Sequence, residues 1–575
     1  MTSPAVSEPT LEPTPRRGPR GPVVVYTAAS AAVLLLIATL ALTTSGAAPP
    51  AIAAFAPQSL HQIKHAPNNQ SGAVGNPGGA PVGPAASPSR KPSPTPSVSP
   101  PAALPPPPRT FTCVGNPPRQ TADPQSPPCV SSWQGNNGGA TTSGVTASTI
   151  RVYMPPLFDN NEYGREVRDL QQYFNTHFEF YGRRLDLAPQ QTGSGAEPSA
   201  TGTCSDIQAQ ADWVAKELDV FAAADNGSDS CWYDELARNK VISLSGQTTE
   251  NASEQQKLAP YVYSYPGDGD NLMQATGDFV CTQLAGKNAV YSPDPVFSRQ
   301  KRTYGLIVSA TNTQYPTPDT LLLARLKSCG ITLATAPIYL QQTGSDDSTQ
   351  GSQDTTAYEG QAANAAAKMA AARVSTVICF CQILATVGVS QGASQQGYHP
   401  EWITERSDQN ILTQGWNASE RNSMLMVSEF PEQIAETSSF FVRALQSVDP
   451  GFCPCATSLD FLYGQLTYWQ LLMLSSGIQM AGPRLTPQSF EHGLQGTTFP
   501  NPEDPLHEGR VDFGSTHSMV GDYSISWWNN SAQSPYGSDP PGSWCYAANG
   551  RRFRLGAFPT TSVLPATLGS APCRT

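Results

Sequence analysis

The chain has 575 residues, a length that suits two to four domains rather than one. Its 54 prolines are well above the roughly 5% expected of an average protein, so part of the chain should lack a packed core. Acidic residues outnumber basic ones, 45 against 34, and the net charge is -11. No basic patch is available to collect phosphates, and we therefore expect no nucleic-acid partner.

An uncharged run from Val23 to Leu42 follows three arginines near the N-terminus. Twenty helical residues at about 1.5 Å each cover the roughly 30 Å hydrocarbon core of a bilayer. Because the arginines precede the run, residues 1–22 should be cytoplasmic and everything after the run extracytoplasmic. We therefore expect a transmembrane helix or signal anchor at 23–44 in a single-pass protein of the cell membrane. The alternative is a signal peptide, cleaved after the small residues that follow, which would give a secreted protein.

Residues 45–145 are rich in Pro, Ser, Gly and Ala and are expected to form a disordered linker. Between Pro77 and Pro108, 13 of 32 residues are proline. Such a stretch has too little apolar surface to offset the entropy of ordering, and at roughly 3.1 Å per residue it reaches at most about 100 Å. It would lift a domain at residues 146–575 off the membrane. Near its end, Cys113 and Cys129 are placed to close a small disulfide loop.

All twelve cysteines lie beyond the uncharged run, which suits an oxidising compartment and disulfides. From proximity in the sequence or in the expected topology, we expect Cys281 to pair with Cys329, Cys545 with Cys573, and the two C-x-C pairs, Cys379/Cys381 and Cys453/Cys455, to cross-link each other. Four thiolates from these two pairs could instead bind zinc. However, C-x-C is not the usual C-x-x-C spacing of structural zinc sites.

Beyond about residue 146, short apolar runs alternate with helical periodicity, which is typical of parallel sheets covered by helices. A first set of strands is predicted at 149–154, 185–188, 218–223 and 241–245, with helices at 205–217 and 232–239 between them. A second set begins near 301, with strands at 303–310, 331–336, 374–380 and 401–404. We therefore predict an α/β fold of two Rossmann-like lobes with parallel sheets, joined by a hinge, with a crossover near 290–300. The apolar stretch 461–480 is interrupted by polar residues, so we predict a core helix there rather than a second membrane span.

One motif suggests covalent chemistry. Residues 388–392 match the G-x-S-x-G of a nucleophile elbow, with histidines downstream. An elbow needs its serine at a strand-to-helix turn, whereas Ser390 should lie inside or at the end of a helix. The local signatures of zinc proteases, P-loop enzymes and dinucleotide enzymes are missing. We therefore expect no catalytic residue, no metal and no cofactor, and keep a secreted or anchored serine hydrolase as an alternative.

A resemblance becomes specific at Cys204, which opens a predicted helix, and Cys231, which follows the next strand. A single βα step could bring the two sulfurs together. The segment resembles the first lobe of the type 1 periplasmic binding proteins, the leucine/isoleucine/valine- and amide-binding class of ABC-transporter receptors, in which a disulfide joins these two elements. Further similarity lies in VTASTIRVYMPP, PYVYSYPGDGDNLMQATGDFV and LTPQSFEHGL. The resemblance covers roughly 145–558 and implies the Cys204 to Cys231 disulfide.

In that family the ligand lies between the lobes, where loops at the carboxyl ends of strands face one another. The positions that correspond in the first lobe are Ser228, Asp229 and Ser230, followed by Ser245, Gly246, Gln247 and Thr248. From the second lobe the matching positions are Cys381 and Gln382, and Glu405, where relatives that bind amino acids often place an acid for the ammonium group.

The resemblance implies an extracytoplasmic solute-binding protein. It would capture a small polar ligand, amino-acid-like or amide-like, by closing two lobes about a hinge. Its partners would be that solute, the membrane through the N-terminal helix, and a membrane permease if it serves an ABC transporter. A sensory or cell-wall interaction ectodomain that has kept the fold without transport is the other alternative.

Overall fold

The structure is a computed structural model. It describes residues 112–155, 161–188, 204–225, 230–246, 251–310, 318–341, 351–381, 383–405, 413–453, 458–502, 508–514, 516–537, 539–569 and 573. The expected transmembrane segment at 23–44 and the Pro-rich stretch at 77–108 lie outside these residues. Within them, no helix is both long enough and apolar enough to cross a membrane.

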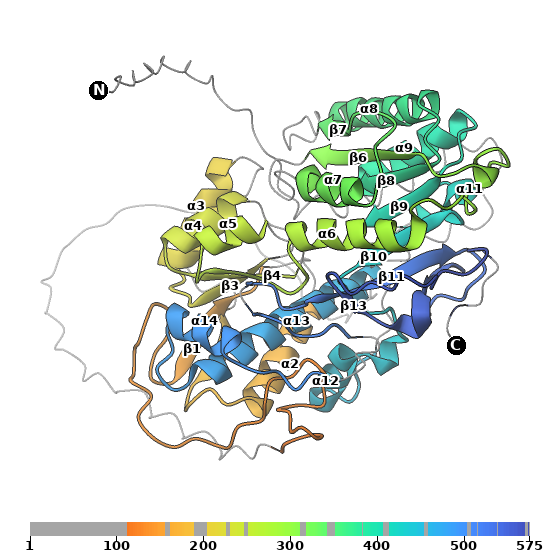
Figure 1. Ribbon diagram of the computed structural model, residues 1–575. Coiled ribbons are helices and arrows are strands. Elements are labelled where there is room, and N and C mark those ends of the chain that lie inside the picture. The colour runs from red at the N-terminus through yellow and green to blue at the C-terminus, as the bar shows by residue number, and fades with distance from the viewer. Residues whose placement is uncertain are drawn as a thin grey trace, which may run out of the picture. The chain divides into compact units, whose positions relative to one another are not determined.

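The first sheet has five parallel strands in the order β2-β1-β3-β4-β5 (Figure 1). The strands are β1 (Thr149–Tyr153), β2 (Arg184–Ala188), β3 (Ala222–Asp225), β4 (Ile242–Ser245) and β5 (Val262–Ser264). Successive side chains of a strand point to opposite faces, so Val152 and Tyr153 join different hydrophobic clusters. Helices cover both faces: α3 (Cys204–Lys216), α4 (Ser230–Arg238) and α5 (Ala252–Lys257) on one, and α2 (Asn161–His177), α13 (Ser458–Ala481) and α14 (Pro487–Gln495) on the other.

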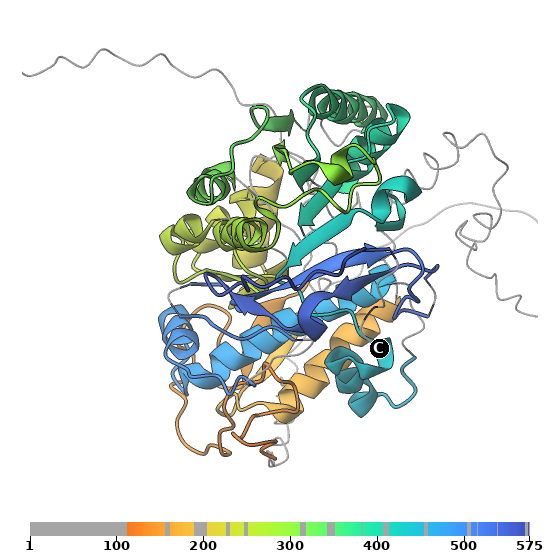
Figure 2. The same ribbon diagram turned by 45° about the vertical axis from the view of Figure 1, so that its right-hand side comes forward.

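The second sheet repeats this order in its parallel part, β7-β6-β8-β9-β10. These strands are β6 (Tyr304–Ala310), β7 (Ile338–Gln341), β8 (Thr376–Phe380), β9 (Glu401–Glu405) and β10 (Met424–Ser428). Antiparallel strands extend it beyond β10: β11 (Asp522–Asn529), β12 (Ser543–Tyr546) and the short β13 (Phe553–Arg554). Both views show these dark blue strands alongside β10 (Figures 1 and 2).

Helices also cover both faces of the second sheet. One face packs against α6 (Gly269–Phe279) and α7 (Pro318–Ser328), and the other against α8 (Gly351–Ala371) and α9 (Ile383–Gln395). Two shorter helices, α11 (Ala418–Arg421) and α12 (Phe440–Val448), complete the α-helices among the described residues. Because β8 and β10 have a strand on each side and helices over both faces of the sheet, every residue of these two mostly apolar strands is buried.

The predicted α/β fold of two parallel sheets is confirmed, and so is the core helix, which is α13. Its apolar side chains join the core of the first sheet. Two predicted strands are wrong in position. The third strand begins at Ala222 rather than at 218, and the run 331–336 contributes only an isolated bridge between Leu333 and Tyr304, whereas the strand β7 forms further on. Local apolar composition cannot tell which of the two runs forms the strand, because pairing with β6 selects it.

Three segments connect the lobes. The first (265–268) runs from the carboxyl end of β5 into α6, and the second (429–439) runs from the carboxyl end of β10 to α12, which packs on α2. The third (508–521, with 515 undescribed) pairs with β5 through Ser518 and Ser264 and then enters β11, which is antiparallel to β10. All three connections therefore lie at the carboxyl ends of the strands of both sheets.

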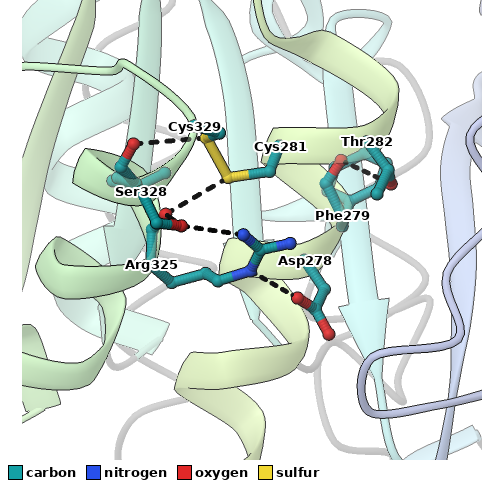
Figure 3. Close-up of a disulfide and its surroundings, with 8 residues drawn as sticks. Asp278, Phe279, Cys281, Thr282, Arg325, Ser328 and Cys329 are labelled. Atoms are coloured by element: carbon teal, nitrogen blue, oxygen red, sulfur yellow. Dashed lines mark hydrogen bonds and ion pairs between the residues drawn. A yellow bond between two sulfur atoms is a disulfide. The ribbon is translucent and has the colours of Figure 1, made fainter.

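Disulfides join Cys113 to Cys129, Cys204 to Cys231, Cys281 to Cys329, and Cys545 to Cys573, the four pairs expected. Figure 3 shows the third of these, which ties the turn after α6 to the end of α7 beside an Arg325 to Asp278 ion pair of 2.6 Å. The expected cross-link between the two C-x-C pairs is wrong. Cys379 bonds to Cys381 instead, because residues two apart on a strand face the same side; Cys455 lies outside the described residues.

The domain division also needs correction at 112–145, which was assigned to the disordered linker. Gln125 and Ser126 of this segment are fully buried. Further along it, the Asn137 side chain donates to the carbonyl of Tyr181, and the carbonyls of Asn137 and Gly139 accept from Arg183. The folded domain therefore includes the loop closed by Cys113 and Cys129, called the disulfide loop below.

Candidate functional site

The expected first-lobe residues lie at adjacent strand ends. Ser230 is the first residue of α4, which follows β3, and Ser245 is the last residue of β4. Asp225 of β3 pairs with Ser245, so the carboxyl ends of these two strands are neighbours. Cys231 lies in the first turn of α4 rather than in a loop, and its disulfide to the first residue of α3 brings the N-termini of the two helices together.

Not all of these residues are open to solvent. Ser230 is half-buried, whereas Ser245 is fully buried and its carbonyl accepts from the N–H of Tyr265 at 2.8 Å. Gly246 is covered by α13, because a Cβ at this position would lie 3.1 Å from Leu466. Ser228, Asp229, Gln247 and Thr248 lie outside the described residues.

The expected second-lobe positions also follow adjacent strands. Cys381 comes directly after β8, and its disulfide partner Cys379 pairs with Thr404 of β9. Glu405 is the last residue of β9, beside Val427 of β10. Gln382 lies outside the described residues, as does the side chain of Glu405. The sheet topology thus brings the described candidate residues to the carboxyl ends of the strands in each sheet.

A buried arginine that the sequence did not reveal links the second connection to the start of β11. Arg552 donates from Nε to Asp522 at 2.7 Å, and from its two terminal nitrogens to the carbonyls of Phe430 and Glu429 at 2.7 and 2.6 Å. The side chains of Arg552 and Asp522 are each only 1% exposed. The signal available in the sequence was the acid Asp522 directly before an apolar run, in GDYSISW.

The first connection passes close to the third. The N–H of Val520 donates to the carbonyl of Tyr265 at 3.0 Å. The first connection also packs on β11, because a Cβ on Gly267 would lie 2.5 Å from the hydroxyl of Tyr523 and glycine allows this approach. Next to it, Asp268 caps α6 by accepting from the N–H of Asn271 at 2.9 Å. Burial raises the pKa of Asp268 to about 6, although this hydrogen bond opposes the rise.

Aromatic rings pack at the same place. Tyr265 stacks on Trp469 of α13 with ring centroids 4.2 Å apart, and Phe430 lies against the same tryptophan. A pocket here is lined by Phe430, Glu432, Gln465 and Trp469, among others. Its free space of about 10 Å³ holds roughly one water molecule. This pocket is therefore too small for a solute.

The hydrolase motif does not form an elbow. Ser390 is inside α9 and is fully buried, so it is not presented at a strand-to-helix turn. His399 instead lies 2.6 Å from Glu420, which also accepts from the indole of Trp402. In the part of the chain that the structure describes, no three His, Cys, Asp or Glu side chains are grouped so as to hold a metal ion. The disulfide between Cys379 and Cys381 removes two of the four thiolates considered for zinc.

No protein-family model matches this chain, and no curated protein matches it. Solute-binding proteins of ABC transporters are among the solved structures that match. One is from an ABC transporter of Rhodopseudomonas palustris BisB5 in complex with 3,4-dihydroxybenzoic acid, with 11% identity, 71% of this chain and 97% of that chain covered, and a TM-score of 0.47. Another is a branched-chain amino acid ABC transporter protein from Thermus thermophilus with bound valine, with 10% identity, 71% and 96% covered, and a TM-score of 0.47. A third is a type 1 periplasmic binding protein from Bordetella pertussis Tohama I, with 11% identity, 69% and 99% covered, and a TM-score of 0.44.

Proposed function

We propose that this chain is an extracytoplasmic solute-binding protein that holds a small polar solute between the carboxyl ends of its two sheets. One observation carries the proposal: both sheets have the doubly wound order 2-1-3-4-5, and all three connections leave or enter at the carboxyl ends. Ligands of open α/β sheets bind outside those ends, at the point where the strand order reverses. Here those points are β1/β3 and β6/β8.

The chemistry of the candidate residues supports an amino-acid-like or amide-like solute. On the first-lobe side, Ser228, Ser230 and Thr248 offer hydroxyls, and the N-terminus of α4 offers N–H groups for a carboxylate or carbonyl. On the second-lobe side, Gln382 offers an amide and Glu405 a charge for an ammonium group. Neither set alone surrounds a small molecule, so binding would require closure of the lobes about the three connections.

Location outside the cytoplasm is supported by the disulfides, since these persist in oxidising compartments. In this proposal residues 23–44 anchor the chain in the membrane, the Pro-rich segment is a spacer, and the solute passes to a membrane permease. A sensory ectodomain would use the same binding step, so the first test concerns binding alone.

A thermal-shift screen tests the proposal with amino acids, amides, hydroxybenzoates, sugars and nucleosides. A solute at 100 times its Kd should stabilise the protein by about 2.7 kcal/mol. For a solute that stabilises, calorimetry on Ser230→Ala, Thr248→Ala and Glu405→Gln should show losses of about 1 to 3 kcal/mol each. Glu405→Gln should weaken ammonium compounds and spare neutral ones. Unchanged affinity in the triple variant would show that the solute binds elsewhere.

A further inference from the structure

The disulfide loop inserts one side chain between two of the three connections. Gln125 is fully buried; its Oε1 accepts from the Tyr265 hydroxyl at 2.9 Å, and its Nε2 donates to the carbonyl of Gly509 at 3.0 Å. Tyr265 begins the first connection and Gly509 belongs to the third. A relative movement of the lobes that displaces either connection would therefore have to break a buried hydrogen bond of the loop.

A buried carboxyl group of the same loop lies beside this bridge. One oxygen of Asp123 accepts from the N–H of Gln125 at 2.7 Å, and the other accepts from the hydroxyl of Tyr468 in α13 at 2.8 Å. Glu508, which precedes Gly509, is 5% exposed, and its Oε2 has no hydrogen-bond partner among the described residues. The cluster therefore contains two buried acids, and the negative charge of Asp123 acts on Glu508.

The surroundings supply little positive charge to this pair. The titratable groups that face it are three tyrosines and two arginines: Tyr173, Tyr265, Tyr468, Arg119 and Arg552. Arg552 is already bonded to Asp522. Burial raises the pKa of Asp123 to about 6, and burial together with the charge of Asp123 raises the pKa of Glu508 to about 8. The docked loop therefore favours at least one bound proton near neutral pH.

We propose that the disulfide loop is a proton-controlled clamp on the connections between the lobes, docked while Asp123 and Glu508 hold a proton and released when both are ionised. Protonation of the pair favours the docked loop, so the clamp tightens as pH falls and loosens as pH rises. As a device that regulates lobe closure, the clamp rests on the proposed function. Its docking equilibrium is a property of the chain without solute and can be measured separately.

Amide hydrogen exchange of the solute-free protein tests the clamp. The N–H of Val520 bonds to the carbonyl of Tyr265 at 3.0 Å and reports on opening of the third connection, whereas the N–H of Ile378 in the buried strand β8 reports on global unfolding. After correction for intrinsic exchange, opening at Val520 should increase steeply between about pH 5 and pH 6, about tenfold per pH unit from pH 6 to pH 8, and level off above about pH 8. Exchange at Ile378 should stay far slower than at Val520 at every pH, because it requires global unfolding rather than release of the loop.

Two neutral isosteres, Glu508→Gln and Asp123→Asn, should flatten this dependence, whereas Glu217→Gln, an exposed acid at the end of α3, should leave it intact. A wild-type opening rate that is independent of pH would overturn the clamp, even if neither isostere folds. A full pH slope in both isosteres would overturn it too. Because no solute is present in this experiment, neither result bears on the proposed binding function, which the thermal-shift screen tests separately.

Discussion

Replacing Arg552 by methionine should destabilise the protein more than almost any other single change among the described polar residues. The guanidinium is bonded to the Asp522 carboxylate and to the carbonyls of Asp522, Phe430 and Glu429, at 2.6 to 2.7 Å. Both members of the ion pair are 1% exposed. Removing one partner of a buried pair typically costs about 3 to 5 kcal/mol, because the other charge is left without compensation. We expect a loss in that range.

Urea unfolding followed by circular dichroism measures the loss. The double variant Arg552→Met with Asp522→Asn should be less destabilised than the sum of the two single variants, since it no longer buries a lone charge. Arg554→Met is the matched control: this arginine is 58% exposed and 4.0 Å from Asp512, so its loss should stay below about 1 kcal/mol. A loss below about 1 kcal/mol for Arg552→Met, or strict additivity in the double variant, would refute the role assigned to this pair.

Three further predictions concern the lobes and their connections. Replacing Cys281 and Cys329 together by serine should cost about 4 kcal/mol of unfolding free energy, from the chain entropy of the loop they close, and urea unfolding that matches the wild type would contradict this. Gly267→Ala should cost about 1 to 3 kcal/mol through its clash with the Tyr523 hydroxyl, and Tyr523→Phe should restore part of the loss; a neutral Gly267→Ala would show that the first connection is not in close contact with β11. Because folding raises the pKa of Asp268, its protonated carboxyl contributes stability that is fully present below the pKa of this group in the unfolded chain. This contribution is lost as the pH rises through about 6. Asp268→Asn, which can still cap α6, should therefore gain up to about 3 kcal/mol relative to wild type above pH 6, and a relative loss there would contradict the shift.

The strands β1, β4 and β8 could be predicted because each is a short apolar run bounded by polar residues. The strand predicted at 331–336 is wrong, although this run is equally apolar, because pairing with β6 and not composition selects the residues of β7. No strand was predicted from residue 424 onward, although every residue of MLMVS is buried. The cysteine pairs at long separation followed from element order, whereas the C-x-C error came from ignoring that a strand places both sulfurs on one face.

For the candidate site, sequence could place Ser230, Ser245 and Glu405 at strand or helix ends but not say which of them face solvent. That depends on how the two sheets are turned about the connections. The contacts that set this turn, such as the bonds of Arg552 to Phe430 and Glu429 and the Gln125 bridge, join residues more than 100 positions apart. No local pattern contains them. Ser245 and Gly246 matched the family by position, yet α13 covers Gly246 in this chain.

The most direct test of the central claim is a distance measurement between the two lobes with and without bound solute. Fluorophores on unnatural amino acids at Glu217 of the first lobe and Tyr339 of the second, both exposed, avoid the disulfide-bonded cysteines. Energy transfer is then recorded while the solute found in the screen is added. We predict a saturable shortening of the distance with the same Kd as calorimetry gives. Saturable binding with no change in distance would contradict closure of the lobes about the solute.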